Sequence, residues 1–322
     1  MSDSNGYGDL TVYSDGKYCR YDDARVGLLS HGLQYGTGCF EGIRGYWSEA
    51  EQDVLLFQLE PHFDRLIRSS RIVMMDVGHS MDQLIEISTE LCARNNYRCD
   101  VYLRAIIFKN LEDIGVRLRG IPETFAVIAV PHKKYFDASH GKRVGIGSWR
   151  RISDTMAPVR AKISGLYINA ALAKTEAEMN GFDEAILLSH DGHLAECSAE
   201  NLFVVRDNVL YTPDTSQNIL EGITRRTVMT LAREELGLSV VERTIDRSDA
   251  YTADEFFFTG TAAGIQFATS IDHRPVGDGT MGPITTKLSA LYDDAVNGRL
   301  PKYRSWVTPT YARPSRLAAT AH

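Results

Sequence analysis

One lysine and one glutamate stand out in this sequence as groups that could do chemistry together. Lys162 lies in the segment 158–169, just before a predicted helix, and a lysine amine can attack a carbonyl group. Glu196 lies in the strand-like run 193–197, where it alternates with apolar neighbours. By spacing alone, both residues are more typical of solvated surface charges than of a site.

Two glycine-bearing segments could bind an anion. Gly222 directly precedes a predicted helix at Ile223 and Thr224, so free backbone N–H groups at that helix end could hold a phosphate. Residues 259–264 follow a predicted strand, and their small side chains allow successive N–H groups to form an anion-binding nest. Neither segment matches a Walker loop or a dinucleotide fingerprint. Each alone is more typical of an ordinary cap or turn, but together they indicate recognition of phosphate or carboxylate.

The N-terminal half is predicted to supply strands and two helices. Short strand-like runs alternate with turn residues between Leu10 and Phe57. A helix is expected from about Pro61, with Phe63, Leu66 and Ile67 on one stripe and Arg65 off it. A second helix opens at Ser80 with the spacing of a capping box to Gln83. The run Val101–Phe108 is predicted to be a strand with Tyr102, Arg104 and Ile106 on one face, and 125–130 is another strand.

The polar, turn-bearing segment 131–141 predicts a linker, which divides the chain into domains at 1–130 and 142–322. Beyond a strand at 144–149, helices are expected from Gly165 to Gly181 and from Ile223 to Leu236. A meander of strands lies between these helices, with turns at 190–192 and 206–208, and another strand spans 255–258. The tail from Pro309 is expected to be frayed.

Composition favours a cytoplasmic globular protein. The 322 residues carry a formal net charge of −7 with no basic stripe, which argues against nucleic-acid binding. The sequence shows no secretion signal and no apolar run that could span a membrane. The 5 cysteines are scattered without a Cys-x-x-Cys pair, so we expect reduced thiols. The 9 histidines form no recognisable ligand cluster, so no metal is expected.

The residues alone leave open whether the amine, the carboxylate and the anion segments meet. A set of collinear motifs, however, resembles branched-chain-amino-acid aminotransferases, which are class IV aminotransferases: pyridoxal-phosphate (PLP) enzymes of fold type IV. The resemblance covers roughly residues 25–306. The motifs are residues 35–44, Lys162 with Tyr167 and Asn169, 196–203, 222–225, 259–263 and 274–279.

The resemblance implies a two-domain α/β (α+β) fold, with a small N-terminal α/β domain, a larger C-terminal domain and PLP in the cleft between them. It implies that Lys162 forms the internal aldimine and that Glu196 lies against the pyridine nitrogen, keeping it protonated. Tyr167 would hydrogen-bond the phenolic oxygen of the ring. The phosphate would be held by Arg65, Ile223, Thr224 and Thr261. For Arg65, a core or surface role stays open.

The same resemblance implies a ping-pong transamination of leucine, isoleucine or valine with 2-oxoglutarate, as in branched-chain amino acid biosynthesis. Tyr102 and the Ala262–Ala263 turn would hold the α-carboxylate, whereas Arg104 and Tyr35 would accept the second carboxylate of glutamate. Phe40 would form the apolar wall, although an ordinary core role is its alternative. The expected partners are small amino acids and 2-oxo acids, and the family implies at least a homodimer. The substrate positions are Tyr35, Phe40, Gly42, Arg44, Tyr102, Arg104, Ala262 and Ala263.

Two departures from the family put the substrate in question. Many bacterial members carry an aromatic residue where this chain has 130–132, Val-Pro-His. The loop 112–119 carries Arg117 and Arg119 and only partly resembles the family's loop, which could shape the site across a dimer interface. An (R)-selective amine or D-amino-acid aminotransferase, or a mixed-activity enzyme, is therefore the alternative function. A PLP-carrying protein without turnover is a third, which the presence of both Lys162 and Glu196 disfavours.

Overall fold

The computed structural model describes residues 7–132 and 140–312, which fall into two compact units. Unit 1 is drawn from Met1–Lys133, Ala161–Gly165 and Ala295–His322, and unit 2 from Lys134–Arg160 and Leu166–Asp294. Lys162 therefore groups by its contacts with the N-terminal part of the chain. Most of the linker expected at 131–141 lies outside the described residues, so the predicted domain boundary stays a prediction.

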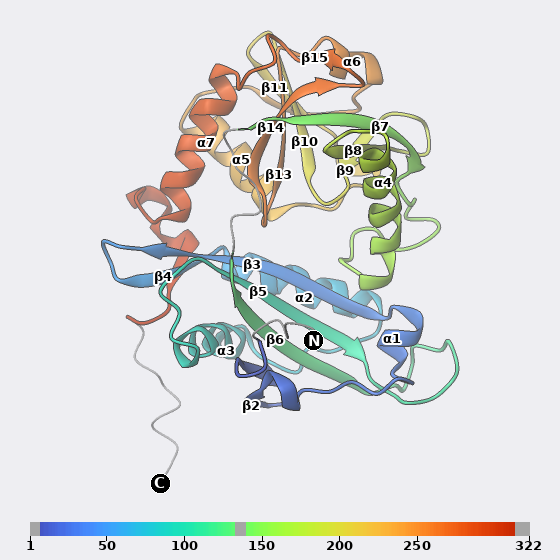
Figure 1. The fold of residues 1–322 in the computed structure, drawn as a ribbon, viewed down its shortest axis with the longest axis vertical. Coiled ribbons are helices and arrows are strands. Elements are labelled where there is room, and N and C mark those ends of the chain that lie inside the picture. Colours follow the sequence, from blue (N-terminus) through green and yellow to red (C-terminus); the bar gives the residue numbers. More distant parts are fainter. Residues whose placement is uncertain (1–6, 133–139, 313–322) are drawn as a thin grey trace, which may run out of the picture. The chain divides into compact units, whose positions relative to one another are not determined.

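Unit 1 is built on a seven-stranded antiparallel sheet in the order β16-β4-β3-β5-β6-β1-β2. Helix α2 packs on β3, and α3 packs on α2, β1 and β6 (Figure 1). The elements are β1 (Thr11–Ser14), β2 (Lys17–Arg20), α1 (His31–Tyr35), β3 (Gly38–Ser48), β4 (Asp53–Phe57), α2 (Leu59–Ile72), α3 (Met81–Arg94), β5 (Val101–Lys109), β6 (Glu123–Pro131) and β16 (Val307–Pro309).

The two longer helices of unit 1, α2 and α3, form where the sequence predicts them. Phe63 and Leu66 of α2 are fully buried. Burial of each side chain stabilises the fold by about 1.5–3 kcal/mol. The capping box at the start of α3 is present, because the Ser80 hydroxyl accepts from the Gln83 N–H and the Gln83 side chain accepts from the Ser80 N–H. The apolar stripe of α2 and the start of α3 are thus confirmed. Helix α1 was not predicted.

The expectation of a frayed tail from Pro309 is wrong for the residues that the structure describes. Strand β16 ends at Pro309 and pairs with β4. Beyond it, the N–H groups of Thr310, Tyr311 and Ala312 donate to the buried carboxylate of Asp53. One buried acid satisfies three backbone donors, so this stretch is docked on the sheet.

Unit 2 contains a mixed nine-stranded sheet in the order β12-β11-β10-β13-β14-β7-β8-β9, with β15 paired to β14. Helix α4 packs on β7 and β8, and α5 packs on β13. The elements are β7 (Lys142–Arg150), α4 (Tyr167–Met179), β8 (Glu184–Leu188), β9 (Leu194–Cys197), β10 (Asn201–Arg206), β11 (Val209–Thr212), α5 (Ile223–Glu234), β12 (Val240–Glu242), α6 (Arg247–Tyr251), β13 (Glu255–Gly260), β14 (Gly264–Ile271), β15 (Arg274–Pro275) and α7 (Pro283–Val296).

The four strands of the expected meander are present as β8 to β11, and the turn chemistry is as predicted. The continuous meander is wrong, because the strands form two hairpins, β8–β9 and β10–β11, which are not neighbours in the sheet order. Asp207 and Asn208, which join β10 to β11, have φ of +52° and +60°, values that Asp and Asn tolerate best among non-glycine residues. Gly181 and Gly237 follow α4 and α5 with φ of +81° and +63°, as C-terminal caps do. The two helices were therefore placed correctly to within about two residues, the usual uncertainty of helix ends.

Within the described ranges, no helix has the length and apolar character needed to cross a bilayer.

All 5 cysteines are unpaired. Three of them, Cys39, Cys92 and Cys197, are buried in the cores. There they act as small apolar side chains.

Candidate active site

Lys162 is anchored to β3 and α2 of unit 1. Its C=O accepts from the N–H of Phe40 at 3.1 Å, and its own N–H donates to the Ser69 hydroxyl at 3.1 Å. Ile163 forms a bridge with Cys39, at a part of β3 where β4 does not pair. The Nζ atom lies 5.0 Å from the centre of the Phe40 ring. The backbone bonds thus hold Lys162 beside Phe40, and the half-buried side chain is not the fully solvated charge that spacing alone suggested.

Phe40 also contacts Arg104, and Arg104 in turn contacts Tyr102, the other polar residue predicted for the substrate. The guanidinium carbon of Arg104 lies 4.4 Å from the Phe40 ring centre, and an Nη atom of Arg104 lies 3.3 Å from the Tyr102 hydroxyl. A methyl group added at Gly42 would overlap that hydroxyl, so glycine leaves the room that Tyr102 fills. The shared strand face of Tyr102 and Arg104 is confirmed. An amine, an apolar ring, a cation and a hydroxyl therefore form one continuous cluster.

Arg65 does not face solvent, although it lies off the apolar stripe of α2. It is buried and forms a forked ion pair with Glu41 of β3, with Nε–Oε1 at 2.7 Å and Nη2–Oε2 at 2.8 Å. His62 Nδ1 lies 2.7 Å from the same carboxylate. Burial alone would raise the pKa of Glu41, but Arg65 and the hydrogen bonds outweigh it and lower this pKa to about 2. Glu41 is thus ionised at any physiological pH.

The remaining substrate positions of unit 1 have other partners. Arg44 pairs with Asp100 at 3.2 Å and lies over the Tyr46 ring. The Tyr35 hydroxyl accepts from the N–H of Gly115 at 3.1 Å, which ties α1 to the arginine-bearing loop. The roles predicted for Arg44 and Tyr35 stay predictions.

Glu196 is buried in unit 2, so its solvent-facing alternative is wrong. One carboxylate oxygen pairs with Arg151 Nε at 2.8 Å. The other accepts from the Asn201 amide at 3.1 Å and from the Leu220 N–H at 3.0 Å. Because both oxygens are hydrogen-bonded, the orientation of this buried carboxylate is fixed. A carboxylate with a fixed orientation can interact with one particular atom of a ligand.

Asn201 connects Glu196 to the start of α5. Its amide also donates to the C=O of Leu220 at 2.9 Å, and a methyl group at Gly222 would overlap its side-chain oxygen. Gly222 is the N-cap of α5 and has no side-chain cap, and both Ile223 and Thr224 are buried. The helix end therefore presents backbone N–H groups, as the sequence predicts for a phosphate site.

Thr261, Ala262 and Ala263 form the turn between β13 and β14, where Gly260 pairs with Gly264. Four side-chain atoms of unit 2 are among the buried polar atoms that lack a hydrogen-bond partner in the described part of the chain. Two of the four belong to motif residues: the hydroxyl oxygen of Thr259 at the end of β13, and the side-chain oxygen of Asn169, two residues after Tyr167 in α4. Unsatisfied buried groups of this kind are typical of ligand sites.

A family model described as "Amino-transferase class IV" matches residues 38–271. A probable branched-chain-amino-acid aminotransferase of Aquifex aeolicus is 42% identical over 93% of this chain and 96% of its own length. The chain belongs to the class IV aminotransferases.

Solved structures of branched-chain aminotransferases share the fold of this class IV aminotransferase. The enzyme of Thermoproteus uzoniensis with norvaline has a TM-score of 0.90 and 40% identity, with 94% of this chain and 100% of that chain covered. The T.th. enzyme complexed with N-(5'-phosphopyridoxyl)-L-glutamate has a TM-score of 0.88 and 37% identity, with 93% and 98% covered. The two-domain α/β fold expected from the sequence is confirmed, and PLP is the cofactor of the family.

The residues of this aminotransferase fit PLP. The cofactor requires an amine for its aldehyde, an acid for its ring nitrogen and donors for its phosphate. The predicted site residues include groups of these kinds: Lys162 and Arg65 belong to unit 1, and Glu196 and the N–H groups that begin α5 belong to unit 2. The unsatisfied Asn169 and Thr259 oxygens of unit 2 point to a polar ligand.

Sequence reasoning missed the partners that hold these groups. On α2, His62, Arg65 and Ser69 are spaced at i, i+3 and i+7, so they share one helix face, and this signal could have been found. Glu41 lies inside the 35–44 motif but was given no role. Arg151 carries no local signal, because its partner Glu196 is far away in sequence.

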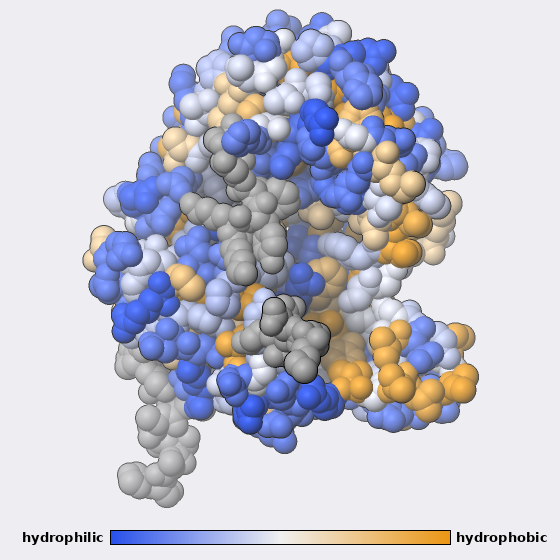
Figure 2. Space-filling view, in the orientation of Figure 1, coloured by the Kyte–Doolittle hydropathy of each residue, from blue (hydrophilic) through white to orange (hydrophobic). Residues whose placement is uncertain are grey.

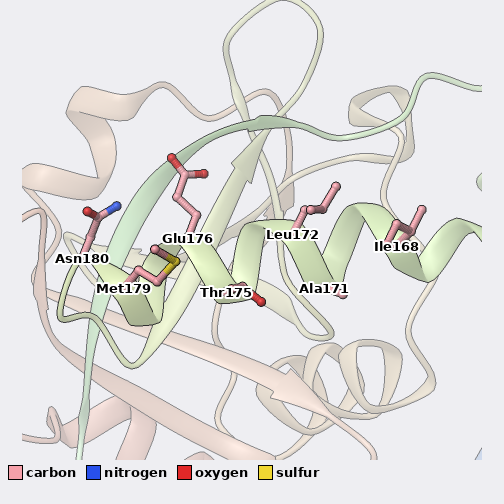
Figure 3. A pocket seen from close by; sticks show the side chains of 7 residues that line it. All are labelled: Ile168, Ala171, Leu172, Thr175, Glu176, Met179 and Asn180. Atoms are coloured by element: carbon pink, nitrogen blue, oxygen red, sulfur yellow. The ribbon is translucent and has the colours of Figure 1, made fainter.

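A hollow on α4 is not the predicted site. It is lined by residues of that helix and its C-terminal cap alone, and none of them is a predicted site residue (Figure 3): Ile168, Ala171, Leu172, Thr175, Glu176, Met179 and Asn180.

Proposed function

We propose that this enzyme transfers the amino group of leucine, isoleucine or valine to 2-oxoglutarate in a ping-pong reaction. The observation that carries the proposal is the cluster of Lys162, Phe40, Arg104 and Tyr102 in unit 1. An apolar ring beside the amine suits a branched aliphatic side chain, while the cation and the hydroxyl suit carboxylates. The related branched-chain aminotransferases, whose solved structures include a norvaline complex and a phosphopyridoxyl-glutamate complex, agree with this substrate pair.

Each residue has a distinct task in this proposal. PLP, when bound, supplies an aldehyde and an electron-accepting ring. Nζ of Lys162 takes the proton from the substrate α-carbon, because a neutral amine is a competent base. The Glu196 carboxylate favours a proton on a ring nitrogen placed beside it. Tyr102 and the backbone at Ala262 and Ala263 bind the α-carboxylate of each substrate in turn. Arg104 and Tyr35 bind the second carboxylate of glutamate.

For the phosphate we propose Arg65, Ile223, Thr224 and Thr261. Arg65 offers a buried planar cation, and the start of α5 offers N–H groups at the positive end of a helix. Tyr167, the first residue of α4, is proposed to donate to the phenolic oxygen of the cofactor ring.

A substrate panel tests the proposal. The PLP-loaded protein should turn over L-leucine, L-isoleucine and L-valine with 2-oxoglutarate and release glutamate, faster than it uses (R)-1-phenylethylamine or D-alanine. Lys162→Ala should abolish turnover, whereas Lys287→Ala, at an exposed lysine of α7, should not. Absence of turnover of all three L-amino acids would contradict the proposal. Preferential use of the (R)-amine or the D-amino acid would support the alternative instead.

We further propose a homodimer that works in the cytoplasm. Large apolar side chains gather on unit 1 over α1 and the loop after β5 (Figure 2). This α1 surface consists of Val26, Leu28, Leu29, Leu33, Ile114 and Val116, all exposed. The Ser30–Glu112 bridge and the Tyr35–Gly115 bond hold its two segments together. A contiguous apolar surface of this kind is typical of a protein interface.

Five unpaired cysteines are consistent with a reducing compartment, which supports the proposal that the enzyme works in the cytoplasm.

A further inference from the structure

The most deeply buried charge near the predicted site belongs to a residue with no assigned role. The carboxylate of Glu41 has 0% exposure and receives Arg65 Nε, Arg65 Nη2 and His62 Nδ1 within 2.8 Å. A charge so far from water is costly unless it is paired and hydrogen-bonded. Three donors on two side chains meet that requirement.

The fork limits how the Arg65 guanidinium can rotate. Glu41 takes the Nε–H and one Nη2–H, which lie on one edge of the planar group. The opposite edge of the Arg65 guanidinium is therefore also held in a fixed orientation. The long arginine side chain would otherwise lose considerable rotamer freedom on binding a ligand, so a partner that fixes it beforehand favours binding.

His62 completes the arrangement without adding a charge. Burial lowers its pKa, and the charges of Arg65 and Lys162 act in the same direction, against Glu41. The ring is therefore neutral and donates its Nδ1 proton to Glu41. Since His62 and Arg65 come from one face of α2, and Ser69 of that helix binds the backbone of Lys162, one helix positions both the cation and the amine.

We propose that Glu41 is a positioning residue that aims Arg65 at the cofactor's phosphate. This inference rests on the proposed function, in which Arg65 binds that phosphate. Glu41 itself touches Arg65 and His62 and need not touch the cofactor. Its effect should therefore appear only for ligands that carry the phosphate.

The test compares PLP with pyridoxal, which has the same aldehyde and no phosphate. Dissociation constants for both are measured by absorbance titration of the apo-protein, for the wild type and for Glu41→Gln. The advantage of PLP over pyridoxal should fall about tenfold in Glu41→Gln, similar to the loss of an outer partner of a ligand-binding group. The affinity for pyridoxal should change little.

Three further variants make the result specific. Glu255→Gln is the matched control, because Glu255 is a buried glutamate of unit 2 that accepts N–H bonds from Ile284 and Thr285 of α7. It should lower stability and leave the PLP advantage intact. Glu41→Asp, which keeps the charge, should retain part of the advantage and replaces Glu41→Gln if that variant does not fold. In an Arg65→Lys background, Glu41→Gln should have little further effect on the ratio.

The outcomes separate this inference from the proposed function. A wild type that prefers PLP, with Glu41→Gln keeping the full preference or losing affinity for both ligands equally, would overturn the role of Glu41 alone. A wild type that forms no chromophore with PLP would overturn the proposed function and this inference with it.

Discussion

At the scale of single residues, the predicted site depends on the partner residue that orients each functional group. Lys162 and Glu196 could be named from the sequence because they lie in recognisable motifs, and Arg65 because the family resemblance implies its role. Their partners Ser69, Glu41 and Arg151 are distant in sequence from them. Burial keeps the charged pairs together, because leaving a buried charge without its partner would destabilise the fold by several kcal/mol. The orientation of each paired side chain is therefore fixed.

Gly42 offers a test of substrate recognition at this scale. Gly42→Ala should raise KM for L-leucine and 2-oxoglutarate by roughly ten- to a hundredfold, since a lost hydrogen bond to a charged group costs about 1.5–3 kcal/mol. The reason is that the added methyl group displaces the Tyr102 hydroxyl from its place beside Arg104. Steady-state kinetics on both substrates is the measurement.

Gly147→Ala serves as the control for this change. Its added methyl group would have its nearest neighbour at 3.6 Å, an ordinary contact, and it also lies in a strand. It should leave both KM values unchanged. Equal KM values for wild type and Gly42→Ala would show that the Tyr102 hydroxyl does not bind substrate.

At the scale of elements, local signals predicted more than long-range ones. The capping box at Ser80, the Asp207–Asn208 turn and the glycine after α5 each depend on neighbours within four residues. In contrast, β16 pairs with β4 across about 250 residues, and Asp53 docks the tail that the sequence suggested was frayed. Apolar periodicity says that a strand exists, but not which strand lies beside it.

The connection from β9 to β10 carries a pH-sensitive group. Burial and the Glu184 charge raise the pKa of Glu200 from 4.5 to about 8, and a bond from the Ala199 N–H and the Lys174 charge oppose this shift. The native protein therefore binds a proton that the unfolded chain has already released. Stability should fall as the pH rises from about 4.5 to about 8, because the unfolded state binds fewer protons there.

Glu200→Gln should remove this contribution. Urea unfolding of the PLP-loaded protein at pH 6 and pH 8.5 should show a smaller loss of stability in the variant than in the wild type. Glu221→Gln, at a half-exposed carboxylate paired with Arg160, should behave like the wild type. The same pH dependence in wild type and Glu200→Gln would contradict the assignment.

At the scale of the whole molecule, the predicted site residues belong to two units. Between Lys134 and Asp294 the chain returns to unit 1 only at Ala161–Gly165, and this short stretch includes Lys162. No composition shift marks such a short return, which is why a division by sequence alone places Lys162 with the C-terminal half. Family motifs located the residue, and the backbone bonds to Phe40 and Ser69 explain its place.

At the same scale, the α1 surface predicts how two copies of the chain assemble into a dimer. Leu28 and Ile114 lie on the α1 surface with 81% and 79% exposure, and burying both on a second copy would stabilise a dimer. Leu28→Glu should place an unpaired charge in that contact and shift the protein toward monomer in analytical ultracentrifugation. Met179→Glu, at an 83% exposed residue of α4, is the matched control and should sediment like the wild type. If Leu28→Glu stays dimeric while Met179→Glu dissociates, α4 rather than the α1 surface forms the interface.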